Sequence, residues 1–357
     1  MKSTASRIAA LVLCLGSGSA FAVTLPPSST CQGVGDCLQY GDFTIYSLNF
    51  LNYKYGTSGN STPYGVSASD GQIKDFIIFG TGSNNAAAQL NPVGMDNAYN
   101  TPEPGGSSSF STAASEPING PAGDVNGQWN ASIGSLRTFL GASQFVSYFR
   151  FNETGNGTAL DEQSLLLWAK VTLRDTVDGD GSGLLADKTY YLRTGASPLA
   201  PITGVSDIDP NVLDTDFASY APWAYVHSDI CAGDPGTGKQ FIHFGPCTTT
   251  EKNSLGNETV PQNLGVNDAA FAVYNKELDD LIHTSDYDYF DLDWQMIYVA
   301  GGAEAAWVQD NTFACPPTAP GCTNINVPEP NSMALIGVGL FGLGLLGIRR
   351  RSTGHTP

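Results

Sequence analysis

The sequence predicts a mainly β protein, an antiparallel and jelly-roll-like β-sandwich with one or two helices at its edges. The 357 residues include 41 Gly and 21 Pro, a composition that suits short strands joined by turns. Several segments alternate apolar and polar residues with period two, as half-buried strands do. No repeat of fixed period is found, which argues against a propeller or a solenoid.

The first 22 residues have the features of a secretory signal peptide. Two basic residues, Lys2 and Arg7, precede an apolar stretch over residues 8–15, and the small residues Ala20 and Ala22 form an A-x-A cleavage site. We therefore expect export through the Sec machinery and cleavage by signal peptidase after Ala22.

Two segments carry the clearest strand pattern. In the first, one face is Leu165, Leu167, Ala169, Val171 and Leu173, opposite Lys170, Thr172 and Arg174. In the second, Phe290, Leu292, Trp294, Met296 and Tyr298 oppose Asp291, Asp293 and Gln295. Weaker strand candidates are residues 43–50, 73–79, 145–151, 188–193 and 241–244.

Two segments have helical spacing instead. Asn267 is a suitable N-cap for a helix whose apolar positions are Phe271, Tyr274, Leu278, Leu281 and Ile282. A shorter helix is predicted from Ile133, Leu136, Phe139 and Leu140. Residues 84–128 are rich in Asn, Pro, Gly and Ser and are predicted to form a long inserted loop.

The exported body is strongly acidic. The chain has 16 Lys and Arg against 34 Asp and Glu, a formal net charge of −18. Five of these bases lie in the two terminal segments, which contain no acid: Lys2, Arg7, Arg349, Arg350 and Arg351. Without them, residues 23–330 have 11 bases against 34 acids, a net charge of −23. Because phosphate neutralisation needs a basic face, this charge argues against binding to nucleic acid.

Six cysteines follow the signal peptide, and an even count in an exported chain indicates disulfides. Their spacing favours the local pairs Cys31–Cys37, Cys231–Cys247 and Cys315–Cys322. The second pair would close a hairpin. A zinc site is the alternative, and it is disfavoured because no C-x-x-C occurs and the four histidines are scattered.

An Asp/Gly-rich segment resembles the start of a calcium loop. Asp178, Asp180 and Ser182 alternate with glycines, so that their oxygens could converge on one cation. Thr189 stands where an EF-hand has its bidentate Glu, and the flanking segments have strand patterns, so an EF-hand is not expected. Two alternatives remain, a weak calcium site in a hairpin loop and, favoured over it, a solvated turn.

Catalytic interpretations find little support in the sequence. Asp291 and Asp293 share one strand face, which is compatible with a catalytic pair, but a solvated acidic face is the favoured interpretation. His227, Asp229 and His243 could suggest a metal or triad site, yet the mature chain has no G-x-S-x-G nucleophile motif. Tryptophans on a sandwich surface can stack on sugars, but core positions are favoured for Trp223, Trp294 and Trp307.

The C-terminal segment combines three features in order. Pro328, Glu329 and Pro330 come first, residues 333–348 follow without a charge, and Arg349, Arg350 and Arg351 come next. As a helix, the uncharged segment rises about 24 Å, against roughly 30 Å for the hydrocarbon core of a bilayer, so it is predicted to be a short transmembrane helix. The arginines favour a cytoplasmic end and place the body of the protein outside.

These three features resemble the PEP-CTERM sorting signal of bacterial exosortase substrates. The resemblance covers residues 327–357, and the tail after Arg351 is longer than is usual in the family. It implies a Gram-negative bacterium, a precursor anchored transiently in the inner membrane, and cleavage near the motif by exosortase. It also implies delivery to the cell surface or extracellular matrix. A permanent C-terminal anchor is the alternative.

The expected organisation is a signal peptide over 1–22, an exported β-rich domain over 23–326 and a sorting signal over 327–357. The favoured function is a structural, non-enzymatic protein of the surface or biofilm matrix, associated with exopolysaccharide and without a cofactor other than the calcium alternative. The competing hypothesis is a secreted glycan hydrolase that uses Asp291 or Asp293. Two carboxylates about 5–10 Å apart across a cleft would favour the hydrolase.

Overall fold

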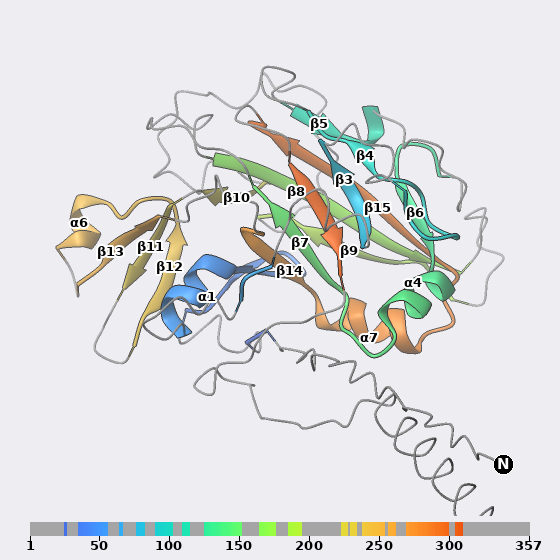
Figure 1. Cartoon of the computed structure of the whole chain (residues 1–357), viewed down its shortest axis with the longest axis horizontal. Helices are drawn as coiled ribbons and strands as arrows, with labels where there is room; N and C mark the ends of the chain where they lie inside the picture. Colours follow the sequence, from blue (N-terminus) through green and yellow to red (C-terminus); the bar gives the residue numbers. More distant parts are fainter. Residues whose placement is uncertain are drawn as a thin grey trace, which may run out of the picture.

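Figure 1 shows the computed structural model of the chain. The structure describes residues 25–26, 35–55, 64–66, 76–82, 90–102, 109–114, 125–151, 164–175, 185–194, 223–227, 229–233, 238–253, 256–261, 269–299 and 304–309. The signal peptide, the 178–183 segment and the sorting signal lie outside these residues.

The protein is mainly β, as predicted, with three sheets and few helices. The seven-stranded sheet has the order β1 (Leu38–Tyr40), β2 (Phe43–Ser47), β14 (Phe271–Tyr274), β7 (Val146–Arg150), β16 (Ala305–Val308), β3 (Ile77–Thr81) and β4 (Tyr99–Asn100). The small sheet has the order β12 (Gln240–Phe244), β11 (Asp229–Gly233) and β13 (Glu258–Pro261). Among the described strands, only β3 and β4 pair in parallel.

The six-stranded sheet is built around its two longest strands, β8 (Ser164–Arg174) and β15 (Tyr289–Ile297), which the sequence predicted. They pair antiparallel from Tyr289↔Arg174 to Ile297↔Leu166. On the far side of β8, β10 (Ala224–His227) and β9 (Lys188–Leu192) pair with successive parts of that strand. On the far side of β15, β6 (Trp129–Ser132) and β5 (Ser109–Ser111) do the same. Two long strands thus carry two short strands on either side.

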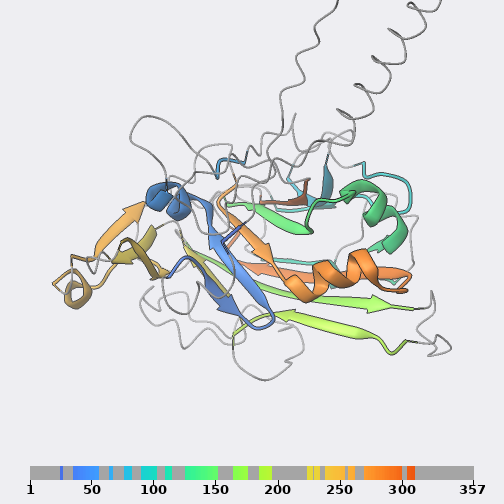
Figure 2. The ribbon, with the colours of Figure 1, turned by 90° about the horizontal axis from the view of Figure 1, so that it is seen from below.

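The two large sheets face each other across an aromatic core (Figure 2). The ring of Phe79 on β3 lies 4.7 Å from that of Trp129 and 6.4 Å from that of Phe290 on the opposite sheet. Trp294 packs directly on Gly80, where an added Cβ would lie 2.7 Å from the indole Cζ2 atom. The absence of a side chain at residue 80 therefore lets the sheets approach closely.

A turn joins the two large sheets along one edge. The hairpin between β1 and β2 places the backbone N–H of Asp42 2.9 Å from the carbonyl of Tyr191 on β9. The Asp42 carboxylate accepts a hydrogen bond of 2.7 Å from the Tyr191 N–H. Gly41 has φ +61° and no room for a Cβ against the Tyr191 carbonyl, so the turn requires glycine.

The helices lie at the ends of the sheets. In Figure 1, α4 (Ile133–Leu140) and α7 (Lys276–Thr284) lie at one end, while the small sheet and α6 (Thr249–Lys252) lie at the other. The prediction of α4 is confirmed, and its apolar residues Ile133, Leu136 and Leu140 are buried. The segment predicted as a strand over 43–50 ends at Ser47, where α1 (Leu48–Tyr55) begins, because the Ser47 hydroxyl accepts a hydrogen bond from the Phe50 N–H.

The helix predicted from Asn267 is wrong in its first half. Residues 271–274 form β14, between β2 and β7 in the seven-stranded sheet. The helix starts at Lys276, and Asn275 caps it by accepting a 2.8 Å hydrogen bond from the Leu278 N–H. Pairing on both sides outweighed the helical spacing of Phe271 and Tyr274, which are residues of high strand propensity.

The long loop predicted over 84–128 is also partly wrong. Its described residues include β4, β5 and the short 3-10 helix η2 (Thr112–Ala114). Buried residues of this segment, such as Met95, Tyr99 and Phe110, belong to the hydrophobic core. A composition typical of loops therefore did not exclude edge strands.

The described helices are all short. None of them is long and apolar enough to cross a membrane. The predicted transmembrane helix over 333–348 lies outside the described residues, so it stays a prediction.

Candidate functional site

The acidic pair on β15 was the main catalytic candidate, and its surroundings are not those expected. Asp291 and Asp293 are only 2% and 8% exposed, so the favoured interpretation of a solvated face is wrong. Phe290, Leu292 and Trp294 line the space between the two large sheets. Because side chains alternate along a strand, Asp291 and Asp293 lie on the other face of β15, which points away from the seven-stranded sheet. The charges are buried because each has a basic partner on β8.

We call Lys170, Arg174, Asp291 and Asp293 the charged row. Arg174 holds Asp291 with two hydrogen bonds, one from Nε to Oδ2 and one of 2.8 Å from Nη2 to Oδ1. Lys170 lies directly opposite Asp293 in the strand register, with Nζ 3.6 Å from Oδ2. Such charge-assisted pairs offset the cost of removing the charges from water.

A hydroxyl group also forms a hydrogen bond with the charged row. Thr112 of η2 donates a 3.0 Å hydrogen bond to Asp293 Oδ1, and its oxygen accepts one of 3.1 Å from the Trp294 N–H. Burial raises the pKa of the Asp291 carboxyl, and the hydrogen bond from Arg174 acts against that rise. The same hydrogen bond raises the pKa of the Arg174 guanidinium. Both carboxylates are therefore engaged in ion pairs, an arrangement typical of structural groups.

In the described part of the chain, His227, Asp229 and His243 are not arranged as a catalytic triad. His227 on β10 accepts a 2.7 Å hydrogen bond from the backbone N–H of Asp229, so the Asp229 carboxylate plays no part in that contact. His243 on β12 pairs instead with Glu251 of α6, with 2.9 Å between Nε2 and Oε1. Glu251 was missed by the sequence analysis, although it follows His243 by eight residues, with Cys247 midway between them.

The disulfide Cys231–Cys247 is formed as predicted, and it ties β11 to the segment before α6. Cys37 is buried and also disulfide-bonded. Cys31, Cys315 and Cys322 lie outside the described residues, so the pairs Cys31–Cys37 and Cys315–Cys322 stay predictions.

The calcium candidates Asp178, Asp180 and Ser182 lie outside the described residues, so this prediction remains untested. Of the flanking acids, Asp175 accepts a 2.8 Å hydrogen bond from the Leu185 N–H. This bond brings the two flanks of the segment together.

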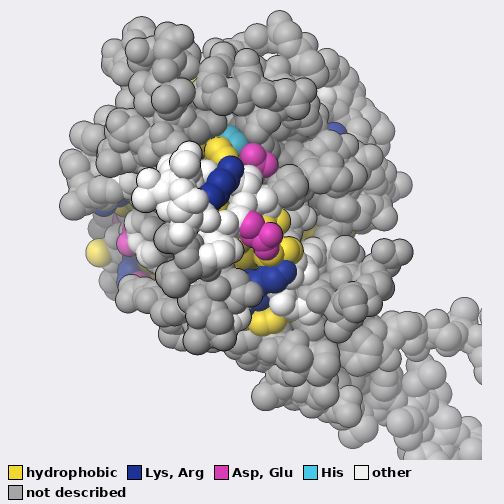
Figure 3. All heavy atoms as spheres, turned by 90° about the vertical axis from the view of Figure 1, so that its left-hand side faces the viewer, with side chains coloured by type: hydrophobic (Ala, Val, Ile, Leu, Met, Phe, Trp, Pro, Cys, Tyr) yellow, Lys and Arg dark blue, Asp and Glu magenta, His cyan; other side chains and the backbone are white. Residues whose placement is uncertain are grey.

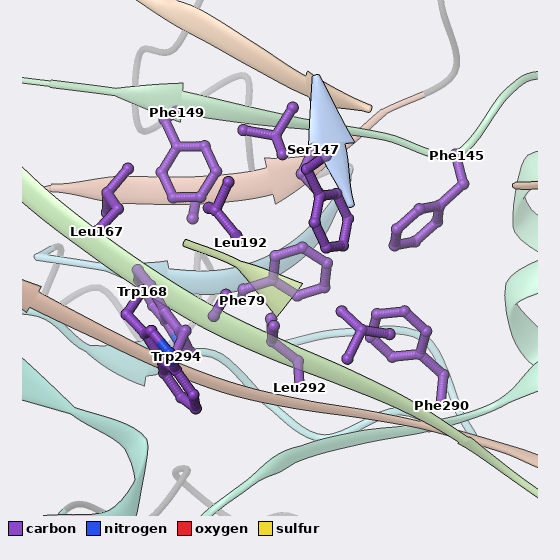
Figure 4. Close-up of a pocket in the computed structure, with 15 residues that line it drawn as sticks. Phe79, Phe145, Ser147, Phe149, Leu167, Trp168, Leu192, Phe290, Leu292 and Trp294 are labelled. Carbon is purple, nitrogen blue, oxygen red and sulfur yellow. The ribbon is translucent and has the colours of Figure 1, made fainter. Parts of the chain in front are cut away.

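A cavity of about 40 Å³ lies between the two large sheets (Figure 4). Phe79, Phe149, Leu167 and Trp294 are among its lining residues, and only Ser147 adds a hydroxyl. A buried water needs about two to four polar partners, and this mostly apolar lining offers few.

The tryptophans belong to the core, as predicted for Trp223, Trp294 and Trp307. All five are at most 3% exposed: Trp129, Trp168, Trp223, Trp294 and Trp307. Stacking on a sugar requires an open ring face, so none of them is available for it.

Two family models match the chain. The model described as a domain of unknown function, DUF8239, matches residues 23–295, well over half of the sequence. The chain belongs to the DUF8239 family. The second model, the PEP-CTERM protein-sorting motif, matches residues 326–351 and confirms the resemblance found in the sequence. Neither a curated protein nor a solved structure matches the chain.

The DUF8239 match begins at residue 23, directly after the predicted cleavage site at Ala22. It ends at residue 295, within β15, so β16 lies beyond it. The fold of this DUF8239 protein therefore extends past the matched range. The sorting motif marks it as an exported protein, anchored in the membrane before exosortase processes it.

Proposed function

We propose that this DUF8239 protein is a non-catalytic component of the cell surface or extracellular matrix. The PEP-CTERM motif after the folded domain carries the proposal, because it directs a protein to export and exosortase processing. The span over 333–348 would hold the precursor in the inner membrane until cleavage near Pro328-Glu329-Pro330 releases the domain.

The state of the charged row supports a non-catalytic role. A glycosidase needs one carboxylic acid that can give up its proton and a second carboxylate that is free to act as base or nucleophile. Here Asp291 is bound by Arg174 through both oxygens, and Asp293 accepts from Thr112 and faces Lys170. Neither carboxylate is available for proton transfer or attack in this arrangement.

The fold and the charge support a structural role outside the cell. The Cys231–Cys247 disulfide of the small sheet suits an oxidising compartment. A net charge of −23 over residues 23–330 keeps such a protein hydrated and soluble. Association with exopolysaccharide would then involve polar surface groups, since the tryptophans are buried.

The sorting part is tested in the native host with and without its exosortase. With exosortase, intact mass of the released protein should correspond to a chain that starts near Val23 and ends near the Pro328-Glu329-Pro330 motif. Without it, the longer precursor should remain in the membrane fraction. Released protein that still contains Arg349 to Arg351 would contradict the proposal.

The non-catalytic part is tested on matrix polysaccharide isolated from the same host. The wild-type protein and the variant Asp293→Asn should both leave the number of reducing sugar ends unchanged. Asn keeps the shape of the side chain and an oxygen acceptor for Thr112. New reducing ends with wild type, absent with the variant, would establish the glycan hydrolase instead.

A further inference from the structure

We propose that Cys231, His243, Cys247 and Glu251 form a zinc site when the two cysteines are thiols, and that the Cys231–Cys247 disulfide excludes the metal. Cys231 lies on β11 and His243 lies on β12. Cys247 precedes α6, and Glu251 lies within that helix.

The side chains already converge. Cys231 lies directly opposite His243 in the antiparallel register, so the two side chains share one face of the small sheet. The ligand atoms of Cys231, His243 and Glu251 all lie within 4.8 Å of one another. The disulfide joins the fourth atom, the sulfur of Cys247, to the Cys231 sulfur of this group.

The hydrogen bonds orient these groups as in known metal sites. Nδ1 of His243 lies 2.7 Å from the Phe244 carbonyl, so it can donate there and leave Nε2 for a metal. A metal-binding histidine almost always donates its second N–H in this way. Glu251 Oε2 accepts a 2.7 Å hydrogen bond from the Thr248 N–H, while Oε1 points to Nε2 of His243. The capping box of α6 thus holds the carboxylate in place.

The chemistry suits zinc. Tetrahedral Zn²⁺ binds Cys sulfur, His nitrogen and carboxylate oxygen, and bond lengths of about 2.0–2.3 Å place neighbouring ligand atoms about 3.3–3.8 Å apart. His243 Nε2 and Glu251 Oε1 are 2.9 Å apart and the Cys231 sulfur lies within 4.8 Å of both, so zinc binding requires that the disulfide opens and that the side chains rotate until the two sulfurs separate. His243 and Glu251 are partly exposed, at 17% and 28% of their side chains, which gives the ion a path from solvent.

The two states exclude each other because a disulfide sulfur has no thiolate to give to a metal. Formation of the disulfide removes two electrons from the sulfurs. These two electrons reduce the disulfide of a separate oxidant by thiol–disulfide exchange. That oxidant takes up two protons and leaves as a dithiol. Zinc is released in the same step. Until then it would hold β11, β12 and α6 in their final arrangement and keep these two sulfurs from pairing with the other cysteines.

The test measures zinc binding by the full-length protein, with a phosphine reductant present and a chromophoric chelator as competitor. We expect the reduced protein to bind zinc, and oxidised protein to lack this site. His243→Gln should weaken the site at least about 100-fold, beyond the 10–100-fold typical of residues outside the ligand shell. The matched control His283→Gln changes a histidine of α7 that bonds the Ser143 carbonyl and should leave the affinity unchanged.

A second measurement separates this site from the other cysteines and from loss of fold. The rate of oxidation of Cys231 and Cys247 is measured by non-reducing peptide mapping. Zinc should slow this oxidation in wild type. It should not slow it in His243→Gln, whose circular dichroism spectrum must match that of wild type. Equal zinc affinity of reduced wild type and His243→Gln would overturn the proposal. An oxidation rate that is insensitive to zinc would overturn it as well.

Discussion

Arg174 and Asp291 illustrate how a buried charge depends on its partner. Their side chains are 7% and 2% exposed, so each charge has lost nearly all of its water. Removing one partner leaves the other charged and buried, whereas removing both leaves an apolar site. The pair is therefore expected to be sensitive to single substitutions and tolerant of paired ones.

Arg174→Met should lower the free energy of unfolding by about 3–5 kcal/mol, because Asp291 would remain buried without its cation. Lys170→Met should cost about 1 kcal/mol or less, since the Lys170 side chain is 29% exposed and Nζ lies 3.6 Å from Asp293. Urea unfolding of the two variants measures the difference. The double variant Arg174→Met/Asp291→Leu should recover much of the loss. Equal effects of the two single variants would contradict this account of the charged row.

Gly80→Ala should destabilise the sandwich by about 1–3 kcal/mol, because its Cβ would lie 2.7 Å from the Trp294 ring and force the sheets apart. Gly134→Ala is the matched control. It lies within α4 with nothing within 4 Å of the added Cβ, so it should stabilise the protein by about 0.5–1 kcal/mol. Thermal unfolding of both variants tests the opposite signs. A Gly80→Ala protein as stable as wild type would show that the core adapts freely at this point.

At the scale of elements, short helices depend on their caps. α6 has only four residues, and the capping box of Thr248 and Glu251 supplies its first hydrogen bonds. α7 begins where the Asn275 side chain accepts from the Leu278 N–H. Short helices gain little from propensity alone, so caps and packing decide where they begin.

The capping box should make stability depend on pH. Burial works to raise the pKa of Glu251, but hydrogen bonds from Thr248 and His243 outweigh it, and the pKa is lowered from 4.5. A carboxyl group whose pKa is lowered by folding stabilises the protein at pH values above the pKa that it has in the unfolded chain. This stabilisation is lost as the pH falls through the pKa that the group has in the folded protein. We expect a loss of up to about 1 kcal/mol below pH 4.5.

The variant Glu251→Gln isolates this effect, because Gln can still accept from the Thr248 N–H but does not titrate. Urea unfolding at pH 7 and at pH 3 should give a stability difference between wild type and variant that is largest at pH 7. A difference of the same size at both pH values would mean that the Glu251 charge is irrelevant.

At the scale of the whole molecule, β16 determines where the domain ends. It lies between β7 and β3 in the seven-stranded sheet, and Trp307 is fully buried. The sorting motif begins at residue 326, after a connection of residues 310–325.

Figure 3, which views the end with the small sheet, shows acidic and basic side chains close together on the described surface. The described surface there is thus mixed in charge, although the exported body as a whole is acidic.

A chain that ends after Asp310 should fold, whereas a chain that ends after Gly302 should not. Both lack the sorting signal and the last two cysteines, so they differ only by residues 303–310, which contain β16. Burying one aromatic side chain of about 150–250 Å² contributes roughly 4–6 kcal/mol, comparable to a net stability of about 5–15 kcal/mol. Circular dichroism during urea unfolding should show a cooperative transition for the longer chain only. Cooperative unfolding of the shorter chain would place the domain end at the DUF8239 match.

The sequence alone determined the export and sorting of the protein, its mainly β class and one disulfide. These properties depend on local order: a motif is read by an enzyme as a linear segment, period-two alternation requires only neighbouring residues, and Cys231 and Cys247 are close in the chain. The tertiary structure decided the start of α7, the burial of Asp291 and Asp293, and the meeting of His243 with Glu251. These depend on pairing between distant segments, such as Arg174 with Asp291, because burial and charge compensation arise only when the chain has folded.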